Sequence, residues 1–366
     1  MVESRFRAIR GRVWGTVLVI ALSLPIAGCG QDSGLSGAHA EAGTGSIVID
    51  GAEIPFSGYA SAEAKEHFVS TVVLPQPSLG DDIEQLREYY GTIDGDRAKR
   101  MKSMFAVDVE ADQVAGVPVQ IVQPQGGVPD ENSGRVLINL HGGAFLWGSG
   151  NGGLVESIPI ASVGGFRVIA VDYRLAPEHR FPAASEDAAA VYAELLTTYE
   201  SPSIGIYGCS AGGILTAQVV AWIDSQGLPL PGAIGTFCGT GLEFTGDSSY
   251  LASPMTGHAA VSHTNPIIRI AALPYFDGVS AEDPLVFPAV SDELLARFPP
   301  TLLIAGGRDF AASSLTTMHR RLARSGVRSQ LFIFDGLWHA FFMDPELPES
   351  REVYGLVARF FETELN

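Results

Sequence analysis

Apolar runs of strand length recur beyond about residue 130 and alternate with longer stretches of helical character. Runs such as 136–140 (VLINL) and 301–305 (TLLIA) have no polar alternation, which is typical of strands buried on both faces. Further strands are predicted over 166–171, 204–207, 232–238 and 329–334, and helices over 183–199, 211–226, 314–325 and 351–365. This alternation predicts an α/β fold with a mostly parallel, doubly wound sheet and helices on both of its faces.

Two regions depart from the alternation. Residues 46–105 are polar and helix-prone, and a predicted hairpin about Ala115-Gly116 follows them. Residues 240–295 contain no clear strand, yet they are too many for a structureless loop in a compact domain. We therefore predict cap helices in both regions, which cover the carboxyl edge of the sheet of a main domain over 106–366.

The first residues have the pattern of a targeting segment. Four arginines precede an apolar stretch over 13–26 that is too short to span a bilayer, and Cys29 follows it in the segment Leu-Pro-Ile-Ala-Gly-Cys. This resembles a bacterial lipobox, so we expect a signal peptide over 1–28, lipidation of Cys29 and a flexible tether over 29–45. The expected location is the bacterial cell envelope, with a lipid anchor as the one membrane contact. A plain secretory signal is the alternative.

Composition limits the classes of partner. The net charge is −18, and an anionic surface repels nucleic acid, so we expect no nucleic-acid partner. No group of His, Cys and Asp has the spacing of metal ligands, so we predict no metal. Besides Cys29 the chain has Cys209 and Cys238, which we expect to be buried thiols, with a disulfide as the alternative.

A candidate nucleophile stands between a predicted strand and a predicted helix. Residues 208–212 read Gly-Cys-Ser-Ala-Gly, a match to G-x-S-x-G centred on Ser210. In this strand–turn–helix setting, a sharp turn exposes the serine hydroxyl, and the N-terminus of the helix favours a developing negative oxygen. The alternative is a serine that only caps the helix in a glycine-rich turn.

A second motif follows the strand VLINL directly. Residues 141–145 read His-Gly-Gly-Ala-Phe, and small residues here let backbone N–H groups approach the oxyanion of a tetrahedral intermediate. We expect His141 to brace this loop. A simple turn at the end of the strand is the alternative interpretation.

These two motifs, together with residues 171–178 (VDYRLAPE), closely resemble the hormone-sensitive-lipase-like family of bacterial esterases. The resemblance extends from about Ala60 to the C-terminus. It implies an α/β-hydrolase fold with a helical cap, a Ser-His-Asp triad, and hydrolysis of short- to medium-chain esters without a cofactor.

The resemblance also implies the triad residues. Ser210 would be the nucleophile, Asp309 in the turn after TLLIA the acid, and His339 in the loop after residues 329–334 the base. The order Ser…Asp…His suits the fold independently. Asp335 is an alternative acid four residues before His339, although we expect it to fix a turn.

The same comparison implies an oxyanion hole with N–H donors at Gly143, Ala144 and Ala211, in a loop shaped by Gly142. The chain departs from the family by having Ala144 in place of a third glycine, Cys209 before the serine, and DFAAS after the Asp309 turn. An alanine keeps its N–H, so these departures concern substrate preference.

Side chains in the 240–295 insertion and beside the motifs are candidates for the substrate pocket. His258 and His263 are candidates for substrate contact. The aromatic candidates, for which core packing is the alternative, are Phe244, Tyr250, Tyr275, Phe276, Trp147 and Trp338.

The sequence therefore predicts a serine carboxylic-ester hydrolase that acts on a small-molecule ester through an acyl-enzyme. A lactonase, amidase or deacetylase with the same triad is one alternative. A catalytically silent envelope binding lipoprotein is another, because a fold alone does not decide activity. The sequence leaves a homodimer open.

Overall fold

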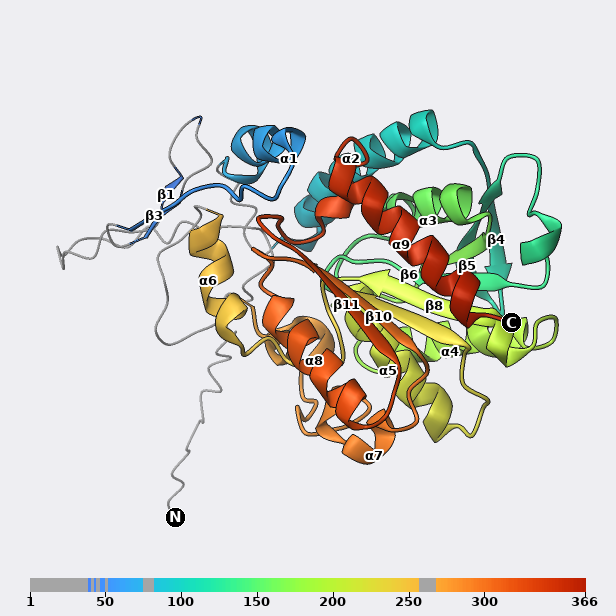
Figure 1. Ribbon diagram of the computed structural model, residues 1–366. Helices are drawn as coiled ribbons and strands as arrows, with labels where there is room; N and C mark the ends of the chain where they lie inside the picture. Colours follow the sequence, from blue (N-terminus) through green and yellow to red (C-terminus); the bar gives the residue numbers. More distant parts are fainter. Residues whose placement is uncertain (1–38, 41–42, 44–46, 50–51, 75–81, 257–267) are drawn as a thin grey trace, which may run out of the picture.

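The computed structural model describes residues 39–40, 43, 47–49, 52–74, 82–256 and 268–366 (Figure 1). Its centre is an eight-stranded sheet with the order β11-β10-β9-β8-β6-β7-β5-β4. The strands are β4 (Val107–Val114), β5 (Val117–Pro124), β6 (Val136–Leu140), β7 (Arg167–Val171), β8 (Ile204–Cys209), β9 (Ala233–Phe237), β10 (Thr301–Gly306) and β11 (Ser329–Phe334). Strands β6 to β11 pair in parallel, whereas β4 and β5 form an antiparallel edge.

Helices cover both faces of this sheet, with α3 and α9 on one face and α4, α5 and α8 on the other (Figure 1). Their bounds are α3 (Asn151–Gly164), α4 (Ala183–Leu195), α5 (Ala211–Ser225), α8 (Ala312–Arg324) and α9 (Pro348–Glu364). Ile138 and Leu140 of β6 belong to one core cluster, and Leu137 belongs to the other. The continuous apolar run of β6 therefore fills two cores, and the predicted fold class is confirmed.

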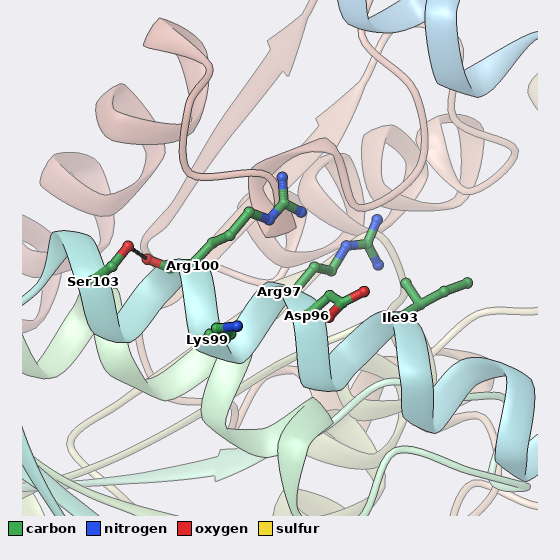
Figure 2. A pocket seen from close by; sticks show the side chains of 6 residues that line it. All are labelled: Ile93, Asp96, Arg97, Lys99, Arg100 and Ser103. Atoms are coloured by element: carbon green, nitrogen blue, oxygen red, sulfur yellow. Dashed lines mark hydrogen bonds between the residues drawn. The ribbon is translucent and has the colours of Figure 1, made fainter.

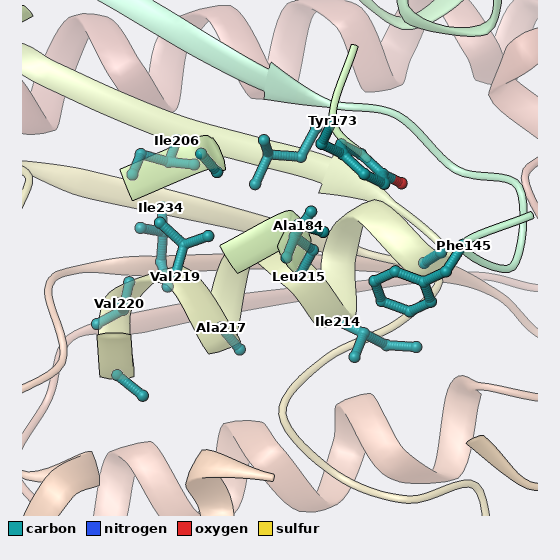
Figure 3. Packing of buried hydrophobic residues seen from close by; sticks show 14 of the residues in the cluster. Phe145, Tyr173, Ala184, Ile206, Ile214, Leu215, Ala217, Val219, Val220 and Ile234 are labelled. Carbon is teal, nitrogen blue, oxygen red and sulfur yellow. The ribbon is translucent and has the colours of Figure 1, made fainter. Parts of the chain in front are cut away.

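The core on the α5 face shows how the sheet and helix interlock (Figure 3). Ile206 of β8 and Ile234 of β9 lie against Leu215 and Val219 of α5, and all four side chains are buried. Burying one such aliphatic side chain contributes about 2 kcal/mol. This packing fixes α5, and with it the turn that joins α5 to β8.

Helix α3 is an element that the hydrophobic pattern did not predict. Its sequence contains Gly152, Gly153 and Pro159, which are poor helix formers, and its side chains are buried around nearly the whole helix. A Cβ at Gly153 would lie 3.2 Å from Cβ of Ala170 in β7, so the glycine lets the helix approach the sheet. Tertiary packing, not local propensity, stabilises α3.

The N-terminal part has helices and one small sheet. The helices are α1 (Ala62–His67), continued by the π-helical segment η1 (Phe68–Val72), and α2 (Ile83–Met104). The unpredicted sheet pairs β1 (His39–Ala40), β2 (Ile47–Ile49) and β3 (Ala52–Ile54) in antiparallel fashion, so β1 lies within the stretch assigned to a tether. Among the residues described, no helix has the length and apolar character needed to cross a bilayer.

The regular elements described within 240–295 are all helical, and they are short. They are α6 (Asp247–Met255), α7 (Asp292–Leu295), and the segments η4 (Ile270–Ala272), η5 (Pro274–Phe276) and η6 (Pro288–Val290). The hydroxyls of Ser248 and Ser249 donate to the carbonyl oxygen of Phe310, at 2.8 and 3.1 Å. Helix α6 is thereby attached to the loop at the carboxyl end of β10.

Candidate active site

Two loops meet at the carboxyl edge of the sheet because β6 and β8 are neighbours. From β6 the chain passes through α3 to β7 on one side, and then returns through α4 to β8 on the other side. Such a reversal of strand order leaves a crevice at the carboxyl ends of the strands, where α/β folds bind ligands. The loop over 141–145 and the turn over 208–212 both lie there.

The turn that carries Ser210 is strained and tightly packed. Ser210 has φ 58° and ψ −120°, and its N–H donates to the carbonyl oxygen of Phe237 at 2.8 Å. A Cβ at Gly208 or Gly212 would lie 2.1 or 1.7 Å from the carbonyl oxygen of Leu140. Only glycine fits at these two positions, so the G-x-S-x-G spacing follows from the close approach of the turn to β6.

Ser210, His339 and Asp309 form a hydrogen-bonded row. Nε2 of His339 lies 3.0 Å from Oγ of Ser210, and Nδ1 lies 2.9 Å from Oδ1 of Asp309. The carboxylate is fully buried, and the imidazole is nearly so. In this arrangement the imidazole can accept the serine proton while the carboxylate holds the ring.

The structure separates the two candidate acids. Oδ1 of Asp309 also accepts the N–H of Ala311 at 2.8 Å, which fixes the carboxylate in the turn after β10. Asp335 instead accepts a hydrogen bond from the hydroxyl of Ser57. The residue that the chain order favoured is thus the one beside His339.

The loop after β6 presents free N–H groups. Gly143 has φ 110°, and a Cβ there would lie 2.1 Å from the carbonyl oxygen of Trp147, so glycine is required. Ala144 adopts a left-handed φ of 54° in the place of the family's third glycine. The N–H groups of Gly143, Ala144 and Ala211 donate to no other described residue, whereas the N–H of Gly142 donates to Oε1 of Glu156 at 2.8 Å. Gly142 therefore shapes the loop.

His141 is a buried support of this loop. Its ring stacks on Tyr173, with centroids 4.2 Å apart, and its Nδ1 lies 2.6 Å from the carbonyl oxygen of Gly142. The hydroxyl of Tyr173 donates to the carbonyl oxygen of His141 at 2.6 Å. Burial lowers the pKa of His141, which favours a neutral ring that braces the backbone.

The aromatic candidates divide between core and site. Tyr275 and Phe276 are buried against Phe145, so they pack the core. Phe244 contacts Phe310, whose ring stacks on His339 with centroids 4.1 Å apart. Trp147, just after the 141–145 loop, stacks on Tyr90 of α2. Trp338, in the loop after β11, stacks on His67 of α1. Both loops are thus in contact with the N-terminal helices. Cys29, His258 and His263 lie outside the described residues.

The two described cysteines are free, buried thiols. Cys238 accepts a hydrogen bond from the N–H of Ala340, with the atoms 3.4 Å apart, and burial raises the pKa of both thiols. Cys238, Asp309 and His339 are also the one group in the described ranges with potential metal-ligand atoms within 4.8 Å of one another. Asp309 and His339 already bond to each other, so the group overlaps the row described above.

Sequence reasoning missed two residues that contact this site. Phe310 covers the His339 ring, and Glu156 bonds to the loop backbone. The single acidic residue within the apolar stretch 151–164 was the one local signal, because a buried charge needs partners.

A separate groove lies on α2 and is lined by Ile93, Asp96, Arg97, Lys99, Arg100 and Ser103 (Figure 2). Its volume is about 590 Å³. Arg97 and Arg100 pair with Asp344 of the η7 (Phe341–Met343) region. The groove contains none of the residues of the hydrogen-bonded row.

Comparison with known proteins agrees with this geometry. A family model described as the alpha/beta hydrolase fold matches residues 137–343. The chain belongs to the α/β-hydrolase family. This α/β-hydrolase is 29% identical over 244 residues to "Putative acetyl-hydrolase LipR" of Mycobacterium tuberculosis, a match over 65% of this chain and 75% of that protein. It is 26% identical over 264 residues to an "Esterase" of Acinetobacter venetianus, which covers 69% and 82% of the two chains.

Solved structures place the α/β-hydrolase in a narrower group. Esterase E25 superposes with a TM-score of 0.72 and 29% identity, over 85% of this chain and 97% of that one. An esterase of the bacterial hormone-sensitive lipase family superposes with a TM-score of 0.69 and 27% identity, over 84% and 100%. This α/β-hydrolase is accordingly a carboxylesterase of the hormone-sensitive-lipase-like group.

Proposed function

We propose that this carboxylesterase cleaves short- to medium-chain acyl esters through an acyl-enzyme on Ser210. The observation that carries the proposal is the row in which Ser210, His339 and Asp309 are joined at 3.0 and 2.9 Å. The names of relatives as acetyl-hydrolases of Mycobacterium tuberculosis and Streptomyces hygroscopicus support a small acyl group.

The reaction has two steps. His339 accepts the proton of the Ser210 hydroxyl as the oxygen attacks the ester carbonyl, and the carbonyl electrons move onto its oxygen. Collapse of this intermediate breaks the bond to the alcohol, which leaves with the proton from His339. Water, deprotonated by His339, then attacks the acyl-enzyme and releases the acid and Ser210.

The remaining groups stabilise charge. Asp309 accepts from Nδ1 of His339 and stabilises the imidazolium that forms in each step. The N–H groups of Gly143, Ala144 and Ala211 are the donors for the negative oxygen. Losing one such donor costs about 100-fold or more in kcat in comparable serine hydrolases.

A panel of substrates tests this function. Nitrophenyl esters with acyl chains of two to twelve carbons, a lactone and an anilide would be compared on the wild-type protein and on Ser210→Ala. We expect turnover of the shorter esters and loss of nearly all turnover in the variant. A protein that prefers the lactone or the anilide would contradict the ester assignment, and full activity of Ser210→Ala would contradict the mechanism.

We further propose that the mature protein is lipid-anchored at Cys29 in a bacterial envelope, a proposal supported by the residues before Cys29 alone. Growth of an expressing bacterium with an alkyne fatty acid should label the wild-type protein and leave Cys29→Ser unlabelled. Equal labelling of the two proteins would contradict the anchor.

A further inference from the structure

One buried carboxylate joins the two halves of the candidate oxyanion hole. Glu156 of α3 is 6% exposed. Its Oε1 accepts the N–H of Gly142 at 2.8 Å, and its Oε2 accepts the N–H of Cys209 at 3.1 Å. Gly142 precedes the donor Gly143 in the loop after β6, and Cys209 precedes Ser210 in the turn after β8.

Further contacts hold this carboxylate in place. The side-chain amide of Asn139 donates to Oε2 at 3.1 Å, and the hydroxyl of Tyr207 donates to the carbonyl oxygen of Glu156 at 3.2 Å. A Cβ on Gly142 would lie 3.1 Å from the carbonyl oxygen of Cys209 and 3.6 Å from Oε1 of Glu156. The loop, the turn and the carboxylate are thus in direct mutual contact.

We propose that Glu156 is a positioning residue for this esterase reaction, which sets the spacing between the Gly143 and Ala144 donors and the Ser210 hydroxyl. The inference rests on the proposed function of Ser210. An N–H donor stabilises the developing oxyanion only when it lies within hydrogen-bond distance of that oxygen. Because Glu156 fixes the donor loop relative to the turn of Ser210, it affects the stability of the transition state. Glu156 touches no reacting atom and acts through its two backbone partners.

The energetic setting agrees with a dedicated role. Burial raises the pKa of Glu156, while the donors at Gly142, Asn139 and Cys209 lower it, and all three of these groups fit an ionised carboxylate. A carboxylate kept in such surroundings is costly for a fold, and an apolar residue would fill α3 at lower cost. The bonds to the loop and the turn are what the carboxylate provides.

The conservative variant Glu156→Gln keeps the volume of the side chain and removes one of its two hydrogen bonds to the loop and the turn. A glutamine has nearly the same shape, but its single oxygen accepts at one end while its NH₂ group donates at the other. Either Gly142 or Cys209 then faces a donor instead of an acceptor. Glu349 offers a matched control, because this buried carboxylate accepts the N–H of Ser61 at 2.6 Å and contacts neither loop nor turn.

The test measures kcat and KM on a nitrophenyl ester, thermal unfolding, and inhibition by a trifluoromethyl ketone, which forms a tetrahedral adduct with serine. For Glu156→Gln we expect kcat to fall about 10- to 100-fold with KM changed less than about threefold. The inhibition constant of the ketone should rise by about the same factor by which kcat/KM falls. Glu349→Gln should lower the unfolding temperature and leave kcat within about twofold.

Other outcomes are decisive as well. A folded Glu156→Gln protein with kcat within twofold of the wild type would overturn the inference, as would an equal fall in kcat for Glu349→Gln. If Glu156→Gln does not fold, Glu156→Asp takes its place, because its shorter side chain cannot reach both N–H groups, and wild-type kcat in that variant would overturn the inference too. Activity retained in Ser210→Ala would instead refute the proposed function itself.

Discussion

The phenyl ring of Phe310 lies against the imidazole ring of His339, with centroids 4.1 Å apart and planes 24° from parallel. Phe310 follows Asp309 directly, so one turn after β10 supplies both the carboxylate that bonds to the imidazole and the ring that covers it. Helix α6 fixes the same turn through bonds from Ser248 and Ser249 to the Phe310 carbonyl oxygen. The insertion is therefore coupled mechanically to the proposed base.

Removing the Phe310 ring should leave the imidazole of His339 less firmly positioned. We expect Phe310→Leu to lower kcat about three- to tenfold, because a displaced imidazole meets the Ser210 hydroxyl less often in the reactive geometry. Steady-state kinetics on a nitrophenyl ester checks this. Phe244→Leu is the control, since the ring of Phe244 lies against Phe310, while it is Phe310 that stacks on His339. Equal effects of the two substitutions would contradict the coupling.

The buried carboxylate of Asp344 should stabilise the contact between α2 and the main domain. Burial by itself would raise its pKa, but the charges of Arg97, His67 and Arg100 outweigh burial and hold the pKa below its ordinary value. We expect Asp344→Asn to lower the free energy of unfolding by about 3 kcal/mol at neutral pH, because it removes the buried negative charge that pairs with half-buried Arg97 and with Arg100.

The sign of the pH dependence follows from the lowered pKa. A carboxyl group with a depressed folded-state pKa stabilises the fold above its unfolded-state value of about 4, and that contribution is lost as pH falls further. Urea unfolding from pH 7 to pH 3 should show the gap between wild type and Asp344→Asn closing below about pH 4. Glu346→Gln, an exposed partner of Arg100, should cost less than about 1 kcal/mol. A gap that widens in acid would refute this assignment.

Two glycines should respond to alanine in opposite ways. Gly91 lies inside α2 with nothing within 4 Å of an added Cβ, so Gly91→Ala should raise stability by about 0.5–1 kcal/mol. Gly212→Ala would place Cβ 1.7 Å from the carbonyl oxygen of Leu140 and should cost about 3 kcal/mol, with loss of activity. Thermal unfolding of both variants measures the difference. A fully active, stable Gly212→Ala protein would show that the turn is less constrained than its packing indicates.

The sequence predicted the features that short segments encode. Strands such as β6 and β10 were recognisable because burial on both faces requires a continuous apolar run. Ser210 and the loop over 141–145 were recognisable because tight turns require glycine at fixed spacings. The pairing of Asp309 with His339 was implied by the family resemblance and by chain order, and the geometry agrees with it.

Features that depend on distant contacts were not predictable in the same way. Helix α3 contains two adjacent glycines and a proline, so its helical form depends on packing against α2, α9, β5 and β7. Glu156 meets Cys209 across 53 positions of sequence, and Phe310 meets His339 only after β10 and β11 are paired. No local pattern carries such information.

Covalent labelling tests the central claim most directly. The protein would be incubated with a fluorophosphonate, digested, and the modified peptide located by mass spectrometry. We predict one adduct, on Ser210, with labelling slowed strongly in His339→Ala and absent in Ser210→Ala. An adduct on another residue, or labelling at the wild-type rate without the imidazole of His339, would contradict it.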